Sequence, residues 1–364
     1  MDLHIINGFL GSGKTTGIIA ATKYLMGQCK LVGIITNDKG QFQVDRSFFE
    51  SSAIPTRQVT GGCFRCSFSE FEDIIAELQD DAKPDVIFAE AVGSCVDLVN
   101  TIFDPLQSIE KLQVSKTTFS VFTDSRLFQI WINDEPLPFS EHINYLFEKQ
   151  MEEGHILIIN KADLLTADER DQLLRQAEKK FPQKSVFLQN SKEPNSVLPW
   201  IEVLKAKDSE PKSPDFSVDY PRYKAGEQEM AWLDQKLTFR SPDPEQIKAA
   251  LTAIVDRLLS ELQEGNVFVA HIKLLITSET QQSKISFTTA DFFAKPMDRA
   301  WVDAIPDVSS DKLEVMLNAR LSVDAQLFYD EVRWIVNQVT QAMNVVVDFK
   351  DGSAYNPVMS MSRP

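Results

Sequence analysis

The chain has 364 residues, which is enough for two domains because a single hydrophobic core stops growing at about 250 to 300 residues. Its composition, with 43% hydrophobic and 25% charged residues, is that of an ordinary globular protein and excludes a disordered or fibrous chain. The formal net charge of -16 disfavours nucleic acids and anionic membranes as partners, since their negative charges would be repelled.

Cysteine content and hydropathy limit the cellular setting. Four cysteines in a chain of this length do not form a disulfide framework, and no apolar run approaches the roughly 18 residues needed to cross a bilayer. The first apolar stretch starts at Leu3 and runs straight into a glycine loop with no basic segment before it, so we expect no signal peptide. These features predict a cytoplasmic protein with reduced thiols.

In the first part of the chain, short β-rich apolar runs alternate with amphipathic helical stretches, a pattern typical of βαβ units on a parallel sheet. Strands are predicted at 3–7, 31–36, 85–90, 117–123, 155–160 and 185–189. Helices are predicted at 14–26, 70–80, 95–106, 140–152 and 167–180. Right-handed crossovers between these strands would give a doubly wound, mainly parallel α/β sheet in a domain covering residues 1–206.

A change of composition follows this domain. Residues 207–229 carry prolines and many charges without an apolar period, which predicts an exposed linker. Residues 230–364 have a βαβ(β)βαβ order, which predicts an α+β domain with a ferredoxin-like antiparallel sheet and helices on one face. Its strands are expected at 230–240, 266–277, 284–289, 312–321 and 344–349, and its helices at 243–264 and 323–343.

A phosphate-binding loop lies between the first predicted strand and the first predicted helix. The stretch GFLGSGKT matches GxxxxGK[ST] in the strand-to-helix context that this motif needs. Main-chain N–H groups of such a loop converge on phosphates, Lys14 can bridge β and γ oxygens, and the Thr15 hydroxyl can bind Mg²⁺. The context disfavours the alternative, a glycine turn that matches by chance. The predicted nucleotide contacts in this loop are Gly8, Gly11, Ser12, Gly13, Lys14, Thr15 and Thr16.

The identity of the base is predicted from the segment NKAD, which follows the strand 155–160. The carboxylate of Asp163 can accept two hydrogen bonds from guanine N1–H and the exocyclic amine. Adenine presents the opposite pattern of hydrogen-bond donors and acceptors, and buried polar groups left without hydrogen bonds weaken binding. This favours GTP, with Asn160, Lys161 and Asp163 at the base. An aspartate that only caps a helix is the alternative interpretation.

Two further segments fit the γ-phosphate and Mg²⁺. Glu90, at the end of the third predicted strand, can hold Mg²⁺ through water, and the N–H of Gly93 can contact the γ-phosphate and move when it leaves. In NDKGQFQVD, Asp38 or Asp45 could order the attacking water or Mg²⁺. A strand-ending glutamate, a turn glycine and a polar loop are the alternatives. We assign Lys14, Asp38 and Glu90 to catalysis, and Thr15, Asp45 and Glu90 to Mg²⁺.

The segments GFLGSGKTT, NDKGQFQVD, GGCFRC, EAVG and NKAD occur in the order, and at about the spacing, of the CobW-type GTPases. The chain resembles this family, which is related to the urease and hydrogenase nickel-insertion GTPases, over roughly its first 205 residues. The resemblance implies binding of GTP or GDP with Mg²⁺, slow GTP hydrolysis, and dimerisation or partner docking controlled by the nucleotide. It also implies transfer of a transition metal or metallocofactor to a client, either a metalloprotein or a corrinoid-dependent protein.

The cysteine loop GGCFRC departs from that family, whose loop usually reads C-x-C-C and binds zinc, cobalt or a similar ion. Cys63 and Cys66 match the outer two cysteines, but Arg65 stands in place of the middle one and cannot be a ligand. Zinc normally takes at least three protein ligands, and Cys95 is a candidate for the third. The hypothesis is a Zn²⁺ or Co²⁺ site of Cys63, Cys66 and Cys95 that senses the nucleotide. Plain packing, or a redox pair beside Arg65, are the alternatives.

Two other functions remain open from the sequence. A small-molecule kinase would use Lys14 and Mg²⁺ but would need an acceptor pocket, and the NKAD segment argues against it because such kinases seldom select guanine. A GTP-binding switch without metal transfer would use Cys63 and Cys66 only to staple a loop. Measuring the preference for GTP over ATP distinguishes the kinase from a GTPase. Substituting the cysteines and measuring client activity tests the switch without metal transfer.

Overall fold

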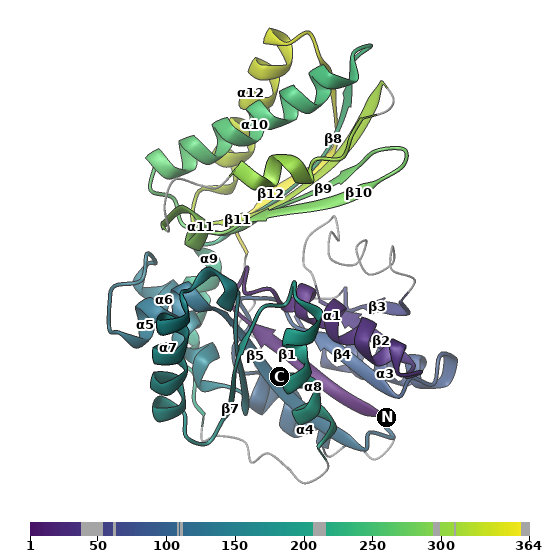
Figure 1. Ribbon diagram of the computed structural model, residues 1–364, viewed down its shortest axis with the longest axis vertical. Helices are drawn as coiled ribbons and strands as arrows, with labels where there is room; N and C mark the ends of the chain where they lie inside the picture. Colours follow the sequence, from purple (N-terminus) through teal and green to yellow (C-terminus); the bar gives the residue numbers. More distant parts are fainter. Residues whose placement is uncertain are drawn as a thin grey trace. The chain divides into compact units, whose positions relative to one another are not determined.

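The computed structural model describes residues 1–37, 54–60, 63–107, 109, 112–206, 216–293, 299–308 and 311–357. The chain falls into two compact units, which divide between Tyr223 and Lys224 and have one sheet each (Figure 1). This division lies inside helix α9 (Tyr220–Gln228). Part of residues 207–229 is therefore helical, while the exposed linker and the domain limits at 206 and 230 stay predictions.

The first unit contains a parallel seven-stranded sheet in the order β3-β2-β4-β1-β5-β6-β7. Its strands are β1 (Asp2–Gly8), β2 (Val32–Thr36), β3 (Thr56–Gln58), β4 (Val86–Glu90), β5 (Lys116–Asp124), β6 (Ile156–Asn160) and β7 (Ser185–Gln189). The doubly wound α/β prediction is confirmed. The short strand β3 lacks a predicted counterpart, because three residues are too few to show an alternating pattern.

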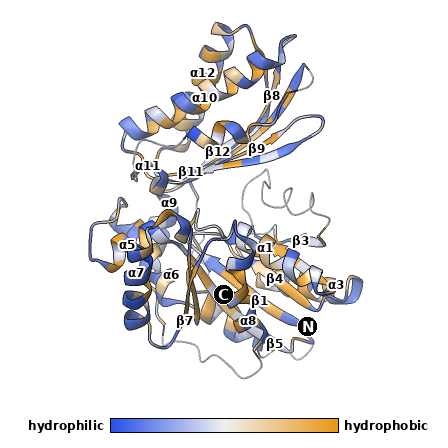
Figure 2. Cartoon of the chain, viewed as in Figure 1, coloured by the Kyte–Doolittle hydropathy of each residue, from blue (hydrophilic) through white to orange (hydrophobic). Residues whose placement is uncertain are grey.

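Both faces of this sheet are buried, as expected for parallel strands connected by helices. On one face, Ile6 and Phe88 pack in a cluster with residues of α1 and α8. On the opposite face, Ile5 and Ile87 are also fully buried. The strands consequently appear as hydrophobic bands in Figure 2. The helices of this unit are α1 (Lys14–Gly27), α3 (Phe68–Asp81), α4 (Asp104–Gln107), α5 (Ser125–Ile132), α6 (Glu141–Glu152), α7 (Ala167–Lys180) and α8 (Leu198–Lys205).

The helix predicted over residues 95–106 begins later than expected. Asp97 has a left-handed backbone, with φ of 72°, which a helix of L-residues does not accommodate. Regular structure starts with a π-helical turn, η1 (Val99–Phe103), which continues into α4. Cys95 therefore lies in the loop after β4 and not in a helix.

The register of the sheet brings the carboxyl ends of its central strands to one edge. Glu90 of β4 pairs with Ile6 of β1 and with Thr36 of β2. Asp124, the last residue of β5, pairs with Asn160, the last residue of β6. Ligands of open α/β sheets bind outside this edge, so the register decides which loops can share a site.

The second unit is an antiparallel five-stranded sheet in the order β10-β9-β11-β8-β12. Its strands are β8 (Ala231–Arg240), β9 (Val269–Thr277), β10 (Gln282–Phe287), β11 (Lys312–Leu321) and β12 (Val346–Tyr355). Helices α10 (Pro244–Glu264) and α12 (Ala325–Ala342) share a hydrophobic core with the sheet. With β10 as an extra edge strand, this is the predicted ferredoxin-like α+β arrangement. Within the described ranges, no helix has both the length and the apolarity required to cross a membrane.

Candidate functional site

Glycines shape the loop between β1 and α1. Gly8, Gly11 and Gly13 have positive φ values of 136°, 75° and 89°. A Cβ on Gly8 would lie 2.1 Å from the carbonyl oxygen of Phe122, and a Cβ on Gly13 would lie 2.3 Å from Nδ2 of Asn160. Glycine is therefore required for both the backbone conformation and the close approach of the neighbouring strands β5 and β6. Such a loop at the N-terminus of a helix directs N–H groups at an anion.

The side chains of this loop suit a polyphosphate. Lys14 is only 7% exposed, and its Nζ donates to the carbonyl oxygens of Gly8 at 2.8 Å and Phe9 at 3.4 Å. The ammonium group therefore lies against the loop itself. Ser12 Oγ is buried and has no hydrogen-bond partner within the described residues. A phosphate oxygen would satisfy this hydroxyl group, whose burial without a partner is otherwise unfavourable.

Two of the predicted Mg²⁺ ligands are in contact. Thr15 Oγ1 donates to Glu90 Oε1 at 2.9 Å, across the edge where β1 and β4 end. Hydroxyl and carboxylate oxygens are the ligand types that Mg²⁺ prefers, so this pair fits a magnesium ion beside a bound triphosphate. The other candidates, Asp38 and Asp45, lie outside the described residues. Thr16, the last predicted contact of the loop, is exposed.

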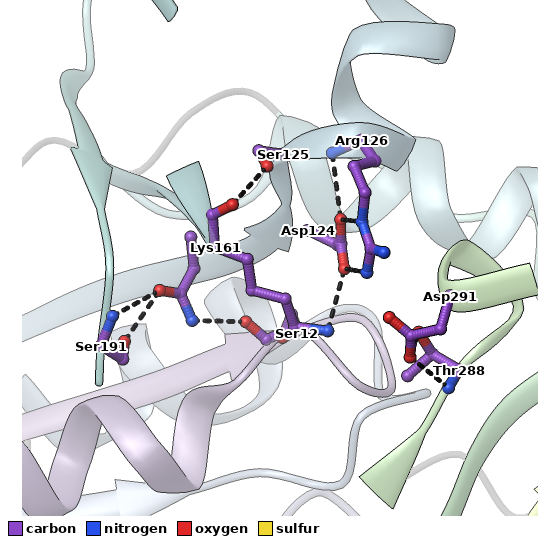
Figure 3. A network of polar contacts seen from close by, with 9 residues as sticks. Ser12, Asp124, Ser125, Arg126, Lys161, Ser191, Thr288 and Asp291 are labelled. Atoms are coloured by element: carbon purple, nitrogen blue, oxygen red, sulfur yellow. Dashed lines mark hydrogen bonds and ion pairs between the residues drawn. The ribbon is translucent and has the colours of Figure 1, made fainter. Parts of the chain in front are cut away.

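Asn160 joins the base-recognition loop to the phosphate loop. Its Nδ2 donates to the carbonyl oxygen of Ser12 at 2.8 Å, and its Oδ1 accepts hydrogen bonds from Ser191 N at 3.1 Å and Ser191 Oγ at 2.8 Å (Figure 3). Asp163 is exposed one turn further on, in the short helix η2 (Ala162–Leu164), where it is open to a base. Sequence reasoning missed Ser191, whose signal is its position two residues after β7, the last strand of the first unit.

Asp124 is a second residue that sequence reasoning missed. It is 3% exposed and lies between two cations, Lys161 Nζ at 2.9 Å and Arg126 Nη2 at 2.8 Å (Figure 3). Burial alone would raise the pKa of Asp124, but Lys161 and Arg126 hold it well below its usual range. The carboxylate is therefore ionised at neutral pH, and it fixes the position of the NKAD lysine. The sequence feature that could have identified Asp124 is a charged residue at the end of a buried strand.

We expect Asp124→Asn to weaken GTP binding by about tenfold, because a charge-assisted hydrogen bond to Lys161 contributes on the order of 1.5 to 3 kcal/mol and the amide retains part of it. Titration with a fluorescent guanine nucleotide measures this change. Asp171→Asn, which removes the same charge from the exposed face of α7, is the matched control and should bind GTP like the unmodified protein. Equal affinities for the two variants would contradict a positioning role for Asp124.

Gly93 lies in the loop after β4, next to the phosphate loop. A Cβ on Gly93 would lie 2.9 Å from Cδ2 of Leu10 and 3.0 Å from its Cα, so this glycine permits the two loops to touch. Gln150 of α6 holds the same loop, since its Nε2 donates to the carbonyl oxygens of Gly93 at 3.1 Å and Cys95 at 2.8 Å. The predicted γ-phosphate sensor and Cys95 are thus attached to one side chain.

A buried carboxyl group supports the end of this loop. Glu153 is 0% exposed, and it accepts hydrogen bonds from Leu98 N at 2.8 Å and Asn7 Nδ2 at 3.1 Å. Burial, with a contribution from the charge of Asp97, raises the pKa of Glu153 to about 8. These bonds tie the loop to β1 and to the end of α6. The sequence offered no signal for this contact, because its members are distant along the chain.

The cysteine loop brings together two of the three predicted sulfur ligands. Cys63 is fully buried and Cys66 is exposed, with their Sγ atoms 3.0 Å apart. Burial would lower the pKa of Arg65, but Tyr223 and the thiols of Cys63, Cys95 and Cys66 raise it above its usual value. In the described part of the chain, no group of three or more His, Cys, Asp or Glu residues could hold a metal ion. The three-sulfur site stays a prediction.

A glycine loop at the carboxyl edge of a parallel sheet, with an adjacent hydroxyl and carboxylate pair, defines a P-loop nucleotide-binding protein. The family model described as CobW/HypB/UreG, nucleotide-binding domain, matches residues 2–188. The chain belongs to this family of P-loop GTPases, and the resemblance noted in its motifs is confirmed.

Curated relatives also match part of the chain. Zinc chaperone CobW of Sinorhizobium sp is 24% identical over an alignment of length 184, which covers 45% of this chain and 51% of that protein. Zinc chaperone YeiR of Escherichia coli (strain K12) is 25% identical over an alignment of length 179, which covers 47% of this chain and 50% of that protein. The chain thus spans about half the length of the curated relatives it matches.

Solved structures are also similar to this chain. HypB from Helicobacter pylori in complex with nickel has a TM-score of 0.42 and 19% identity, and the match covers 60% of this chain and 92% of that one. A Zn(II)-bound triple mutant of the YjiA GTPase has a TM-score of 0.38 and 13% identity, with 93% of this chain and 98% of that one covered.

Proposed function

We propose that this protein is a Mg²⁺-dependent GTPase that couples GTP binding and hydrolysis to delivery of a transition metal, or of a metallocofactor, to a client protein in the cytoplasm. The main support for guanine-nucleotide binding is the hydrogen bond from Asn160 to Ser12, which connects the predicted base-recognition loop directly to the phosphate loop. The relatives named as zinc chaperones support the metal part.

The residues of the phosphate loop have distinct roles in this proposal. Lys14 exchanges its contacts with Gly8 and Phe9 for phosphate oxygens. Thr15 and Glu90 hold Mg²⁺, which, when bound, neutralises phosphate charge and orients the triphosphate. Asp163 accepts hydrogen bonds from guanine, and Asp38 positions the attacking water.

The loop after β4 links the nucleotide to the metal. Gly93 and Cys95 are two residues apart and share the Gln150 contact, so a shift of Gly93 on loss of the γ-phosphate displaces Cys95 as well. Zn²⁺ or Co²⁺ would be carried as cargo by Cys63 and Cys66, completed by Cys95. The client is a metalloprotein or a corrinoid-dependent protein, and a homodimer controlled by the nucleotide is part of the proposal.

Nucleotide titration tests the proposed preference for guanine. GTP is expected to bind at least about 100-fold more tightly than ATP, because ATP leaves the base-recognition groups unpaired. Asp163→Asn should remove most of this preference, whereas Asp168→Asn, an equal change at an exposed site in α7, should keep it. Similar affinities of the unmodified protein for GTP and ATP would contradict the assignment.

The coupling is tested by titrating Zn²⁺ and Co²⁺ with and without a non-hydrolysable GTP analogue. If metal and nucleotide are linked, the analogue changes metal affinity, and the metal changes analogue affinity by the same factor. Identical metal affinity in both states would remove the coupling from the proposed function and leave a GTP-binding switch.

A further inference from the structure

Cys63 and Cys66 form a close pair of thiols on the turn that leads into α3. Their Sγ atoms are 3.0 Å apart, and the N–H of Cys66 donates to the carbonyl oxygen of Cys63 at 2.8 Å. Cys63 is 0% exposed, whereas Cys66 is exposed. The pair therefore has one buried sulfur and one sulfur that small molecules can reach.

The turn between these cysteines is anchored on both sides. Phe64 is fully buried, and its ring stacks on that of Phe71 with centroids 4.2 Å apart. The N–H of Phe64 donates to Asn37 Oδ1 at 3.2 Å. The backbone thus holds the two cysteines close together. Their sulfurs, 3.0 Å apart, need to approach by about 1 Å to reach the disulfide bond length, and side-chain rotation can supply this movement.

A fixed positive charge lies beside the pair. The Arg65 guanidinium carbon is 5.3 Å from the ring centroid of Tyr220 and 5.0 Å from that of Tyr223. The hydroxyl group of Tyr220 in turn donates to the carboxylate of Asp97. The same guanidinium interacts electrostatically with the thiols of Cys63, Cys95 and Cys66. A cation in this position attracts anionic reaction partners.

We propose that Cys63 and Cys66 are a redox-active dithiol that reacts with anionic small-molecule disulfides of the glutathione type. Cys66 loses its proton and attacks, as the thiolate, one sulfur of the small disulfide, which forms a mixed disulfide and releases one small thiolate that takes up a proton. Cys63 then attacks Sγ of Cys66 in the same way, forms the intramolecular disulfide and releases the second small thiolate, which takes up the Cys63 proton. The protein loses two electrons and two protons, and one small disulfide is reduced to two thiols.

Oxidation would also regulate the metal site, and this consequence rests on the proposed function. A disulfide removes both sulfurs as metal ligands, because thiolates bind zinc and cobalt. The oxidised protein would retain its phosphate loop and would lose its cargo site. The redox state of the pair would then decide whether a GTP cycle delivers metal.

The test uses the full chain carrying Cys29→Ser, since Cys29 is the other exposed cysteine. The protein is treated with glutathione disulfide in the presence of EDTA and without nucleotide. Intact mass and peptide mapping should show the Cys63–Cys66 disulfide in roughly tenfold or greater excess over the mixed disulfide, because the second thiol is already in place. Reduced glutathione should restore both thiols.

Single substitutions in the same background separate the two steps. Cys63→Ser should stop at a mixed disulfide on Cys66, and Cys66→Ser should react at least about tenfold more slowly, because the remaining sulfur is buried. Arg65→Gln should slow the reaction with glutathione disulfide more than the reaction with the uncharged hydroxyethyl disulfide. Arg57→Gln, at a half-buried arginine on β3 that pairs with Asp81, is the matched control and should leave both rates unchanged.

A mixed disulfide that persists on Cys66 while the Cys63 thiol stays intact would overturn the proposal. So would thiols that remain unmodified in the folded protein but react fully in denaturant. Because the reaction contains neither metal nor nucleotide, these outcomes leave the proposed GTPase function unaffected. Conversely, disulfide formation in a protein that fails to bind GTP would support the dithiol and contradict the proposed function.

Discussion

Replacing Lys14 by alanine is expected to lower the affinity of the protein for GTP by about 100-fold, because hydrogen bonds from a charged donor contribute on the order of 1.5 to 3 kcal/mol and the ammonium group would contact more than one phosphate oxygen. The side chain is 7% exposed and already lies over the carbonyl oxygens of Gly8 and Phe9, where phosphate groups are expected. Equilibrium titration with GTP and Mg²⁺ measures the loss.

Lys23→Ala is the matched control for this substitution, because it removes the same charge from the exposed face of the same helix, α1. It should bind GTP as tightly as the unmodified protein. Thermal unfolding of both variants checks that the loop remains folded. Lys14→Ala with unchanged GTP affinity and an intact fold would show that the nucleotide does not occupy this loop.

Removing the carboxylate of Glu227 is expected to destabilise the second unit by about 3 to 5 kcal/mol, because it leaves a buried charge without its partner. Glu227 in α9 and Arg320 in β11 are both 0% exposed, and Arg320 Nη2 donates to Glu227 Oε1 at 3.2 Å. The guanidinium carbon of Arg320 also lies 4.2 Å from the ring centroid of Trp232. Without Glu227, the cation therefore stays buried against this ring and is not hydrated. Urea unfolding followed by tryptophan fluorescence measures the effect.

Glu264→Ala, at the exposed end of α10, is the control for the loss of a glutamate and should change stability by less than about 0.5 kcal/mol. The double variant Glu227→Ala and Arg320→Met should recover much of the lost stability, since no unpaired charge then remains buried. If Glu227→Ala unfolds at the same urea concentration as Glu264→Ala, the ion pair does not stabilise this unit.

The phosphate loop and the NKAD segment could be predicted because each is continuous in sequence. A strand, a short polar loop and a helix follow one another within a few residues, so the chemistry of the loop can be identified without knowing what lies next to it. The same holds for the alternating strands and helices of both units. The helix assigned to residues 95–106 was misplaced because the left-handed conformation of Asp97 leaves no pattern in the sequence.

The contacts that position the site could not be predicted, because they join residues far apart in the chain. Asn160 and Ser12 are separated by 148 positions, and Gln150 reaches Gly93 across 57. Asp124 becomes a site residue only because the register of β5 and β6 places it beside Lys161. Likewise, the sequence places Cys63 near Cys66 but does not show that one sulfur is buried and the other exposed.

The sequence by itself determined the family, the α/β fold and the residue types that can contact a guanine nucleotide, since these depend on local pattern and side-chain chemistry. Only the tertiary structure decided which loops meet at the edge of the sheet, which charges are paired and which sulfur is accessible. The physical reason is that hydrogen bonding, burial and electrostatic interaction depend on distance in space, which strand register and helix packing establish.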